Sequence, residues 1–479
     1  MAFAPTLESL AGHRVPAWYD DAKFGIFIHW GLFSVPAFAA RAESVAAAFR
    51  DHYGDAIARV PYTEWYWNAI RVPESESARH HREVWHDAPY ENFREPFLNS
   101  LKLWDPEGWA DLFADAGARY VVLVAKHHDG FCLWPSAAAN PRQRDWASPR
   151  DIVGELAAAV RARGMKFGVY YSGGIDWTFN RAPLRTLGEF LGSTPGGDYP
   201  AYAEAQMREL MARYDPDILW NDISWPTPLG PLMRLFADYY NAREDGVVND
   251  RWMPLTLRMR LLRMREVQRL LDASIEKRLK KGEGGNGIVP PPPPHYDFRT
   301  PEYTTFDTIQ ARKWETTRGM SASFGYNARD TDSDYQSVDD LVRGFIDAVA
   351  KNGNLLLNVG PRGVDAQIPP AQIARLKGFG TWLRANAEAI YGTRPWSRAE
   401  GRTDGGGEVR FVARGGAVYA HVWPAPAGDF TLEGAPPAAS AVHVASGARL
   451  ACTPTPAGLR IVLPSPLAPA PAHAFALAV

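Results

Sequence analysis

The chain has 479 residues, 46% of them hydrophobic, so it can build a sizeable core and more than one domain. Its 52 Lys and Arg residues nearly balance 54 Asp and Glu residues, which argues against nucleic acid as the main partner. With two cysteines, no run of about 18 apolar residues and no signal-peptide pattern at the start, we expect a soluble, cytoplasmic protein without a disulfide framework or a membrane partner.

The first predicted strand covers residues 24–28 and ends at His29. A histidine in this position is either structural or part of a pocket. Farther along, residues 62–66 place Glu64 among aromatic side chains. Most glutamates are solvated, but a carboxylate surrounded by rings is a candidate for lining a cleft.

The stretch from Val121 to Ala125 is wholly apolar and predicts a strand buried on both faces. It stops abruptly at Lys126, His127, His128 and Asp129, followed by Gly130. In barrels of alternating strands and helices, chemistry collects where strands end and the following loops begin. The sequence therefore predicts a polar pocket at this strand end.

The same pattern recurs at residues 167–172, which include Tyr170, and at residues 218–222, which end in Asp222. Side chains alternate along a strand, so Trp220 and Asp222 share one face. Helical periodicity separates these strands, at residues 109–116, 152–160 and 200–214. This alternation favours a parallel α/β fold, and we predict a (β/α)8-like barrel.

Residues 253–294 interrupt the pattern with a basic amphipathic segment, then a glycine tract and five prolines. The simplest interpretation is a surface insertion. The alternatives are a contact within a homo-oligomer and a mobile lid.

After a predicted helix at 338–349, a strand at 354–360 and a helix at 373–390, the pattern changes near Trp396. Short alternating runs follow, separated by Gly and Pro, which predicts a small antiparallel β-sandwich. We therefore divide the chain into a catalytic domain at 1–396 and a β-sandwich at 397–479.

Several kinds of site have no support in the sequence. A metal site is not supported by His127 and His128. They are adjacent, so on a strand they point to opposite faces and do not converge on one ion. Metal motifs such as HExxH or paired CxxC, a nucleophile elbow and a GxGxxG turn after a strand are absent. We expect neither a metal nor a cofactor.

Two carboxylates remain as the natural machinery: Asp222 at a strand end and Glu302 in the segment Thr300-Pro-Glu-Tyr303. One carboxylate attacking an anomeric carbon and another delivering a proton is the arrangement of a retaining glycosidase. The 17 tryptophans agree with a carbohydrate ligand, because an indole face suits the C–H side of a sugar ring.

Six motifs in residues 15–396 resemble, in the family's order, those of the retaining α-L-fucosidases, glycoside hydrolase family 29. They are WYDDAKFGIFIHWGLFSVPAF, AKHHDGFCLWPS, FGVYYSGGIDW, DILWNDISWP, KWETTRGMSASFGYN and KNGNLLLNVGPRG. The resemblance implies a (β/α)8-like barrel followed by a β-sandwich. It also implies exo-acting hydrolysis of terminal α-L-fucosyl residues, from a fucosylated oligosaccharide or glycoconjugate, through a covalent fucosyl-enzyme intermediate.

By the same resemblance, Asp222 is the nucleophile, and Glu302 is the acid/base because FRTPEY matches one bacterial pattern. The insertion at 253–294 departs from that pattern, in which Arg251 and the acid/base lie nearer in sequence. The residues implied to hold fucose are His29, Glu64, His127, His128, Tyr170, Trp220 and Arg251, with Phe324 on the apolar side of the sugar.

Alternatives stay open at this point. Glu64 and Glu315 are the rival acids, and we expect Glu315 to pair with Arg318, which would lower its pKa. The chain could also be an inactive, lectin-like fucose-binding protein, or a scaffold that uses its basic insertion. The presence of both Asp222 and Glu302 weighs against an inactive protein.

Overall fold

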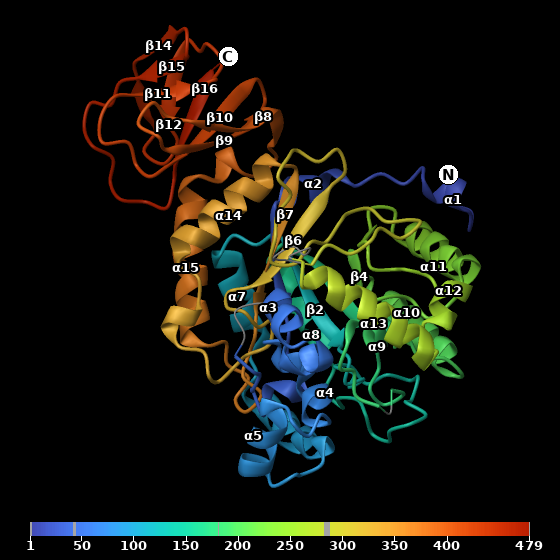
Figure 1. Cartoon of the computed structure of the whole chain (residues 1–479). Coiled ribbons are helices and arrows are strands. Elements are labelled where there is room, and N and C mark those ends of the chain that lie inside the picture. Colours follow the sequence, from blue (N-terminus) through green and yellow to red (C-terminus); the bar gives the residue numbers. More distant parts are fainter. Residues whose placement is uncertain (1, 42–44, 181, 282–287, 479) are drawn as a thin grey trace.

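The computed structural model describes residues 2–41, 45–180, 182–281 and 288–478. Parallel strands and helices form a barrel, and the antiparallel strands that follow lie together at one end of the molecule, in red in Figure 1. The predicted fold, a (β/α)8-like barrel followed by an antiparallel β-sandwich, is confirmed.

The described part of the barrel has a sheet of seven parallel strands in the order β5-β4-β3-β2-β1-β7-β6. These strands are β1 Phe24–Ile28, β2 Tyr120–Lys126, β3 Lys166–Ser172, β4 Ile218–Asp222, β5 Val247–Val248, β6 Trp314–Gly319 and β7 Gly353–Val359. Every residue of β1, β2, β4 and β7 is buried. Burial on both faces explains why β1, β2 and β4 are apolar until the polar residues at or just after their ends.

Residues 297–303 occupy the eighth position of the barrel as an irregular segment. On one side, the backbone N–H of Asp297 donates to the carbonyl of Val248, the last residue of β5, at 3.0 Å. On the other side, the N–H of Arg299 donates to the carbonyl of Lys313, beside β6, at 3.1 Å. The segment therefore joins both edge strands and closes the barrel, which an open doubly wound sheet would not do.

Helices cover the outside of the barrel, and side-chain caps fix several of their starts. Asp105 accepts a hydrogen bond from Gly108 N at 3.0 Å and Asp151 from Gly154 N at 2.9 Å, which caps α7 and α8. No helix in the described ranges is both long and apolar enough to cross a membrane. The helices are α1 Leu7–Leu10, α2 Ala17–Ala22, α3 Val45–Asp51, α4 Tyr66–Ile70, α5 Glu76–Trp85, α6 Arg94–Ser100, α7 Pro106–Asp115, α8 Ile152–Ala162, α9 Leu187–Leu191, α10 Tyr199–Tyr214, α11 Leu229–Ala242, α12 Leu257–Leu261, α13 Arg265–Leu279, α14 Val338–Ala350 and α15 Pro370–Ala385.

The predicted insertion contains α12 and α13. Neither helix has a buried residue, as expected of a surface insertion. Even so, α13 is tied to the rest of the molecule, because Asp272 accepts hydrogen bonds from the hydroxyls of Tyr53 and Thr186, each at 2.8 Å. The tract at 282–287 lies outside the described residues.

The C-terminal strands form two antiparallel sheets that share one core. For example, the rings of Phe430 in the smaller sheet and Phe475 in the larger sheet lie 5.3 Å apart. The sandwich docks on the barrel helices, where Arg410 donates to Asp347 of α14 at 2.6 Å. The six-stranded sheet runs β13 Ala448–Leu450, β12 Ser440–His443, β16 His473–Ala478, β10 Ala417–Trp423, β9 Glu408–Arg414 and β8 Arg394–Arg402, and the three-stranded sheet runs β11 Phe430–Glu433, β15 Gly458–Ile461 and β14 Cys452–Thr455.

Candidate active site

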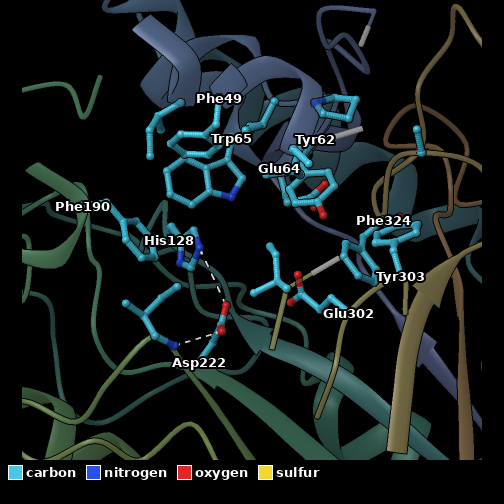
Figure 2. Close-up of a pocket in the computed structure, with 18 of the residues that line it drawn as sticks. Phe49, Tyr62, Glu64, Trp65, His128, Phe190, Asp222, Glu302, Tyr303 and Phe324 are labelled. Atoms are coloured by element: carbon cyan, nitrogen blue, oxygen red, sulfur yellow. Dashed lines mark hydrogen bonds and ion pairs between the residues drawn. The ribbon is translucent and has the colours of Figure 1, made fainter. Parts of the chain in front are cut away.

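One cavity of about 660 Å³ opens at the carboxyl ends of the barrel strands, and part of its lining is shown in Figure 2. Every residue that the sequence analysis proposed for the site lines this cavity. They are His29, Glu64, His127, His128, Tyr170, Trp220, Asp222, Arg251, Glu302 and Phe324. Segments from residue 29 to residue 324 therefore meet at one place.

Asp222 is the last residue of β4, and its carboxylate is held by hydrogen bonds. Tyr170 donates its hydroxyl to Oδ2 at 2.7 Å, and Arg251 donates Nη1 to Oδ1 at 2.9 Å. Burial by itself raises the pKa of Asp222, but the charge of Arg251, the neighbouring His128 and these hydrogen bonds outweigh it and lower that pKa. Asp222 is therefore an ionised carboxylate at neutral pH.

Glu302 lies on the segment at residues 297–303 that closes the barrel. Its Oε1 is 2.7 Å from Arg251 Nη1. Its backbone exchanges two hydrogen bonds with Ile288 at the end of the insertion, at 2.8 and 3.1 Å. Burial raises the pKa of Glu302 and repulsion from Asp222 adds to this, while Arg251 opposes it. The net shift is upward, opposite to that of Asp222.

One nitrogen, Nη1 of Arg251, contacts both carboxylates. Because Asp222 Oδ1 lies 2.9 Å and Glu302 Oε1 lies 2.7 Å from this atom, these two oxygens can be at most 5.6 Å apart. The guanidinium is itself fixed by Thr300, to whose hydroxyl and carbonyl it donates at 3.0 Å each, and it lies over the ring of Trp220 at 4.8 Å. The two carboxylates are thus held close together by a rigid cation.

Three histidines present neutral rings to the cavity. Nδ1 of His29 is 2.6 Å from Asn358 Oδ1, and Nδ1 of His128 is 2.6 Å from Ser172 Oγ. Burial lowers the pKa of His29 to about 3 and of His128 to about 4, and it lowers the pKa of His127 well below its usual range. A neutral imidazole both donates and accepts, which suits sugar hydroxyls.

His127 Nδ1 is buried and has no hydrogen-bond partner among the described residues. The ring of His127 stacks on Tyr170, with centroids 5.4 Å apart, so its orientation is fixed. An unpaired buried polar atom is costly.

Glu64 reaches the cavity from the short 3-10 helix η3 Thr63–Trp65. Its Oε2 accepts a hydrogen bond from the backbone N–H of Gly325 at 2.9 Å. A Cβ at Gly325 would lie 2.2 Å from Thr63 Oγ1, so this close approach requires glycine. Burial raises the pKa of Glu64 to about 7.

Among the lining residues that the sequence analysis missed are the aromatic residues Tyr62, Trp65 and Tyr303. The rings of Tyr62 and Tyr303 lie 5.4 and 5.2 Å from Phe324, and Figure 2 shows these three rings on one side of the pocket. Their positions in the sequence carried a signal, because Tyr62 and Trp65 flank Glu64 in one stretch and Tyr303 directly follows Glu302.

The predicted ion pair between Glu315 and Arg318 is wrong. Glu315 instead accepts hydrogen bonds from the hydroxyls of Tyr19 and Tyr120, at 2.9 and 2.6 Å, and from the indole of Trp220 at 3.2 Å. Residues three apart on a strand point to opposite faces, so Glu315 faces the barrel interior and Arg318 does not. Burial raises the pKa of Glu315 to about 7, where a lowered pKa was expected.

The described residues contain no group of three or more His, Cys, Asp or Glu side chains that could hold a metal ion. The cavity contains two carboxyl groups that contact Arg251: Asp222, which is ionised, and Glu302, whose pKa is raised. It also contains neutral imidazoles and aromatic faces. This arrangement can bind a neutral, hydroxyl-rich ring with one apolar side and carry out nucleophilic and acid–base chemistry on it.

Comparison with known proteins agrees with this chemistry. The family model described as Alpha-L-fucosidase matches residues 1–388. The tissue alpha-L-fucosidase of Bos taurus is 30% identical over 431 residues, covering 88% of this chain and 78% of that protein, and the alpha-L-fucosidase of Dictyostelium discoideum is 31% identical over 410 residues, covering 82% and 75%. A crystal structure of the Thermotoga maritima alpha-fucosidase with a mechanism-based inhibitor aligns over 100% of both chains, with 37% identity and a TM-score of 0.82. The chain belongs to the alpha-L-fucosidase family of glycoside hydrolases.

Proposed function

We propose that the protein is a retaining, exo-acting α-L-fucosidase that releases terminal α-L-fucosyl residues from oligosaccharides or glycoconjugates by double displacement. The observation that carries this proposal is the contact of one Arg251 nitrogen with both Asp222 and Glu302. Carboxyl groups lie about 5–5.5 Å apart in retaining glycosidases and about 6.5–9.5 Å apart in inverting ones. The upper bound of 5.6 Å between two of their oxygens supports retention.

In the first step, Asp222 attacks the anomeric carbon while Glu302 protonates the departing glycosidic oxygen. The pKa shifts suit these roles, because Asp222 has a lowered pKa and Glu302 has a raised one. A nucleophile must be ionised and an acid must hold its proton at the same pH. The products of this step are the free aglycone and a fucosyl ester of Asp222.

In the second step, water cleaves the ester. Esterified Asp222 carries no charge, so its repulsion no longer raises the pKa of Glu302, and Arg251 is left with one carboxylate to stabilise. Glu302 therefore becomes a base that takes a proton from the attacking water. Two inversions at the anomeric carbon give fucose of the original configuration.

Recognition of fucose follows from the polarity of the cavity. The three ring hydroxyls of fucose meet neutral imidazoles and Glu64, while Phe324 offers a face to the apolar side of the sugar. The ring of Phe324 is held by His29, which stacks on it at 4.9 Å.

The proposal is tested with 4-methylumbelliferyl α-L-fucoside and with NMR of the first sugar formed. We expect turnover, with α-L-fucose appearing before mutarotation produces the β anomer. Initial release of the β anomer would exclude retention. Fucose binding without any turnover would instead support the lectin-like alternative.

A further inference from the structure

The cavity extends well beyond the polar groups that suit fucose. Its volume of about 660 Å³ fits a drug-sized ligand, on the order of 300–1,000 Å³, rather than a single monosaccharide. Three helices that are separate in sequence form the additional wall, namely α3, α9 and α13. This apolar wall consists of Val45, Phe49, Leu187, Phe190, Ile275 and Leu279.

The position of α13 in the apolar wall is fixed by Asp272. This side chain accepts hydrogen bonds from the hydroxyls of Tyr53 and Thr186 and from the backbone N–H of Gly188, each at 2.8 Å. A Cβ at Gly188 would lie 2.6 Å from Asp272 Oδ1, so the fit between α9 and α13 depends on glycine. Ile275 and Leu279 come three and seven residues after Asp272, on the same helix face, and line the cavity.

The apolar wall offers little to a second sugar. Among the described residues, Arg50 is the one polar side chain that α3, α9 and α13 contribute to the lining. A sugar placed against the wall would lose water from its hydroxyls without gaining partners, which costs free energy. The side chains of Ile275 and Leu279 are only partly buried, so an apolar ligand would gain by covering them.

The apolar wall also lies where a leaving group departs. Ile288 lines the same cavity and pairs through its backbone with Glu302, the proposed acid. In Figure 2, Phe49 and Trp65 lie on the opposite side of the pocket from Asp222, with Phe190 beside His128. Fucose bound at Asp222 would thus turn its glycosidic oxygen toward Glu302 and its aglycone toward the wall.

We propose that the apolar wall is an aglycone site, and that the preferred substrates are α-L-fucosides of apolar alcohols or phenols rather than fucose linked to another sugar. This inference rests on the proposed fucosidase function and names the substrate class of that same site.

The test compares kcat/KM for methyl and hexyl α-L-fucosides, whose alcohols are similar leaving groups, and for a fucosyl-galactose disaccharide. We expect the hexyl fucoside to exceed the methyl fucoside by at least about 10-fold, because five methylenes gain apolar contact. In the double variant Ile275→Asn, Leu279→Asn, the ratio of hexyl to methyl should fall toward one. Leu270→Asn is the matched control, because Leu270 lies on the same helix with 76% of its surface exposed, and this variant should keep the ratio.

The outcomes separate this inference from the proposed function. If no fucoside is hydrolysed, the fucosidase function itself fails. If fucosides are hydrolysed but the ratio is near one, or the disaccharide is preferred over the hexyl fucoside, the aglycone site is overturned and the fucosidase stands. If the double variant does not fold, the comparison of the three substrates on the unmodified enzyme decides.

Discussion

Arg251 acts on the pKa of both proposed catalytic carboxyls, because its charge lowers the pKa of Asp222 and opposes the rise that burial causes in the pKa of Glu302. In Arg251→Met both pKa values should rise. The acid limb of the kcat/KM profile, which reports ionisation of Asp222, and the basic limb, which reports deprotonation of Glu302, should both move to higher pH. Arg251→Lys keeps the charge and should shift the limbs less. Limbs that stay in place in Arg251→Met would contradict this role.

Asp222→Ala should fold, because Arg251 keeps Glu302 as a partner for its charge. Turnover should fall by about three or more decades, since covalent catalysis needs the missing oxygen. Azide added with an aryl fucoside should partly restore cleavage and yield β-fucosyl azide, which NMR identifies. Activity like that of the unmodified enzyme would remove Asp222 from the role of nucleophile.

Glu302→Ala should affect substrates unequally. Only poor leaving groups need protonation, so the rate on alkyl fucosides should fall by about 100-fold or more, with a smaller loss on aryl fucosides. The basic limb of the pH profile should also flatten, because the raised pKa of Glu302 produces it. Equal losses together with a surviving basic limb would point instead to Glu64, whose pKa is about 7.

Among single residues, the sequence predicted those that stand where an apolar strand stops. His127, His128 and Asp222 are of this kind. A polar side chain directly after a buried apolar run is a poor core residue, so its position indicates a pocket. Glu315 shows where the reasoning failed. Its hydrogen-bond partners Tyr19 and Tyr120 lie far away in sequence, so only the closed barrel reveals them.

At the scale of elements, α13 differs from the barrel strands in how it is held. No residue of α13 is buried, whereas every residue of β2 is. Amide hydrogens of α13 should therefore exchange faster than those of β2, by local opening rather than global unfolding. Hydrogen exchange with mass spectrometry measures this, and the core helix α8 is a suitable control. Exchange in α13 as slow as in β2 would contradict the prediction.

The sequence predicted those elements in which a helical periodicity of apolar residues, as in α14, or a continuous apolar run, as in β2 and β4, extends over several residues. The segment at 297–303 could not be found in this way, because it is irregular and takes its place in the barrel through backbone contacts with Val248 and Lys313. The contribution of α13 to the cavity was also hidden, since an amphipathic pattern does not say what its apolar face meets.

Glu315 links several barrel elements, so its titration should be visible in the stability of the whole molecule. Its pKa in the folded protein is about 7, above the ordinary value of 4.5. Between these values the folded protein holds a proton that the unfolded chain has lost, so the free energy of unfolding falls as pH rises.

Glu315→Gln removes this contribution. Relative to the variant, the unmodified protein should lose up to about 1.4 kcal/mol per pH unit between pH 5 and 7. Urea unfolding of both proteins across this range gives the difference. Parallel curves would show that Glu315 titrates normally in the fold.

The expected cytoplasmic location, the domain boundary at 396 and the state of assembly stay predictions.

The insertion begins two residues after Arg251 and returns to pair with Glu302 through Ile288. Its two ends thus lie next to residues that we propose act on the fucosyl bond, while its middle forms one side of the apolar wall. Descendants of this gene could accumulate changes in the middle of the insertion under selection for new alcohols or phenols. The strand-end residues that we propose recognise fucose would not have to change, so specificity for the sugar and specificity for the alcohol can evolve separately.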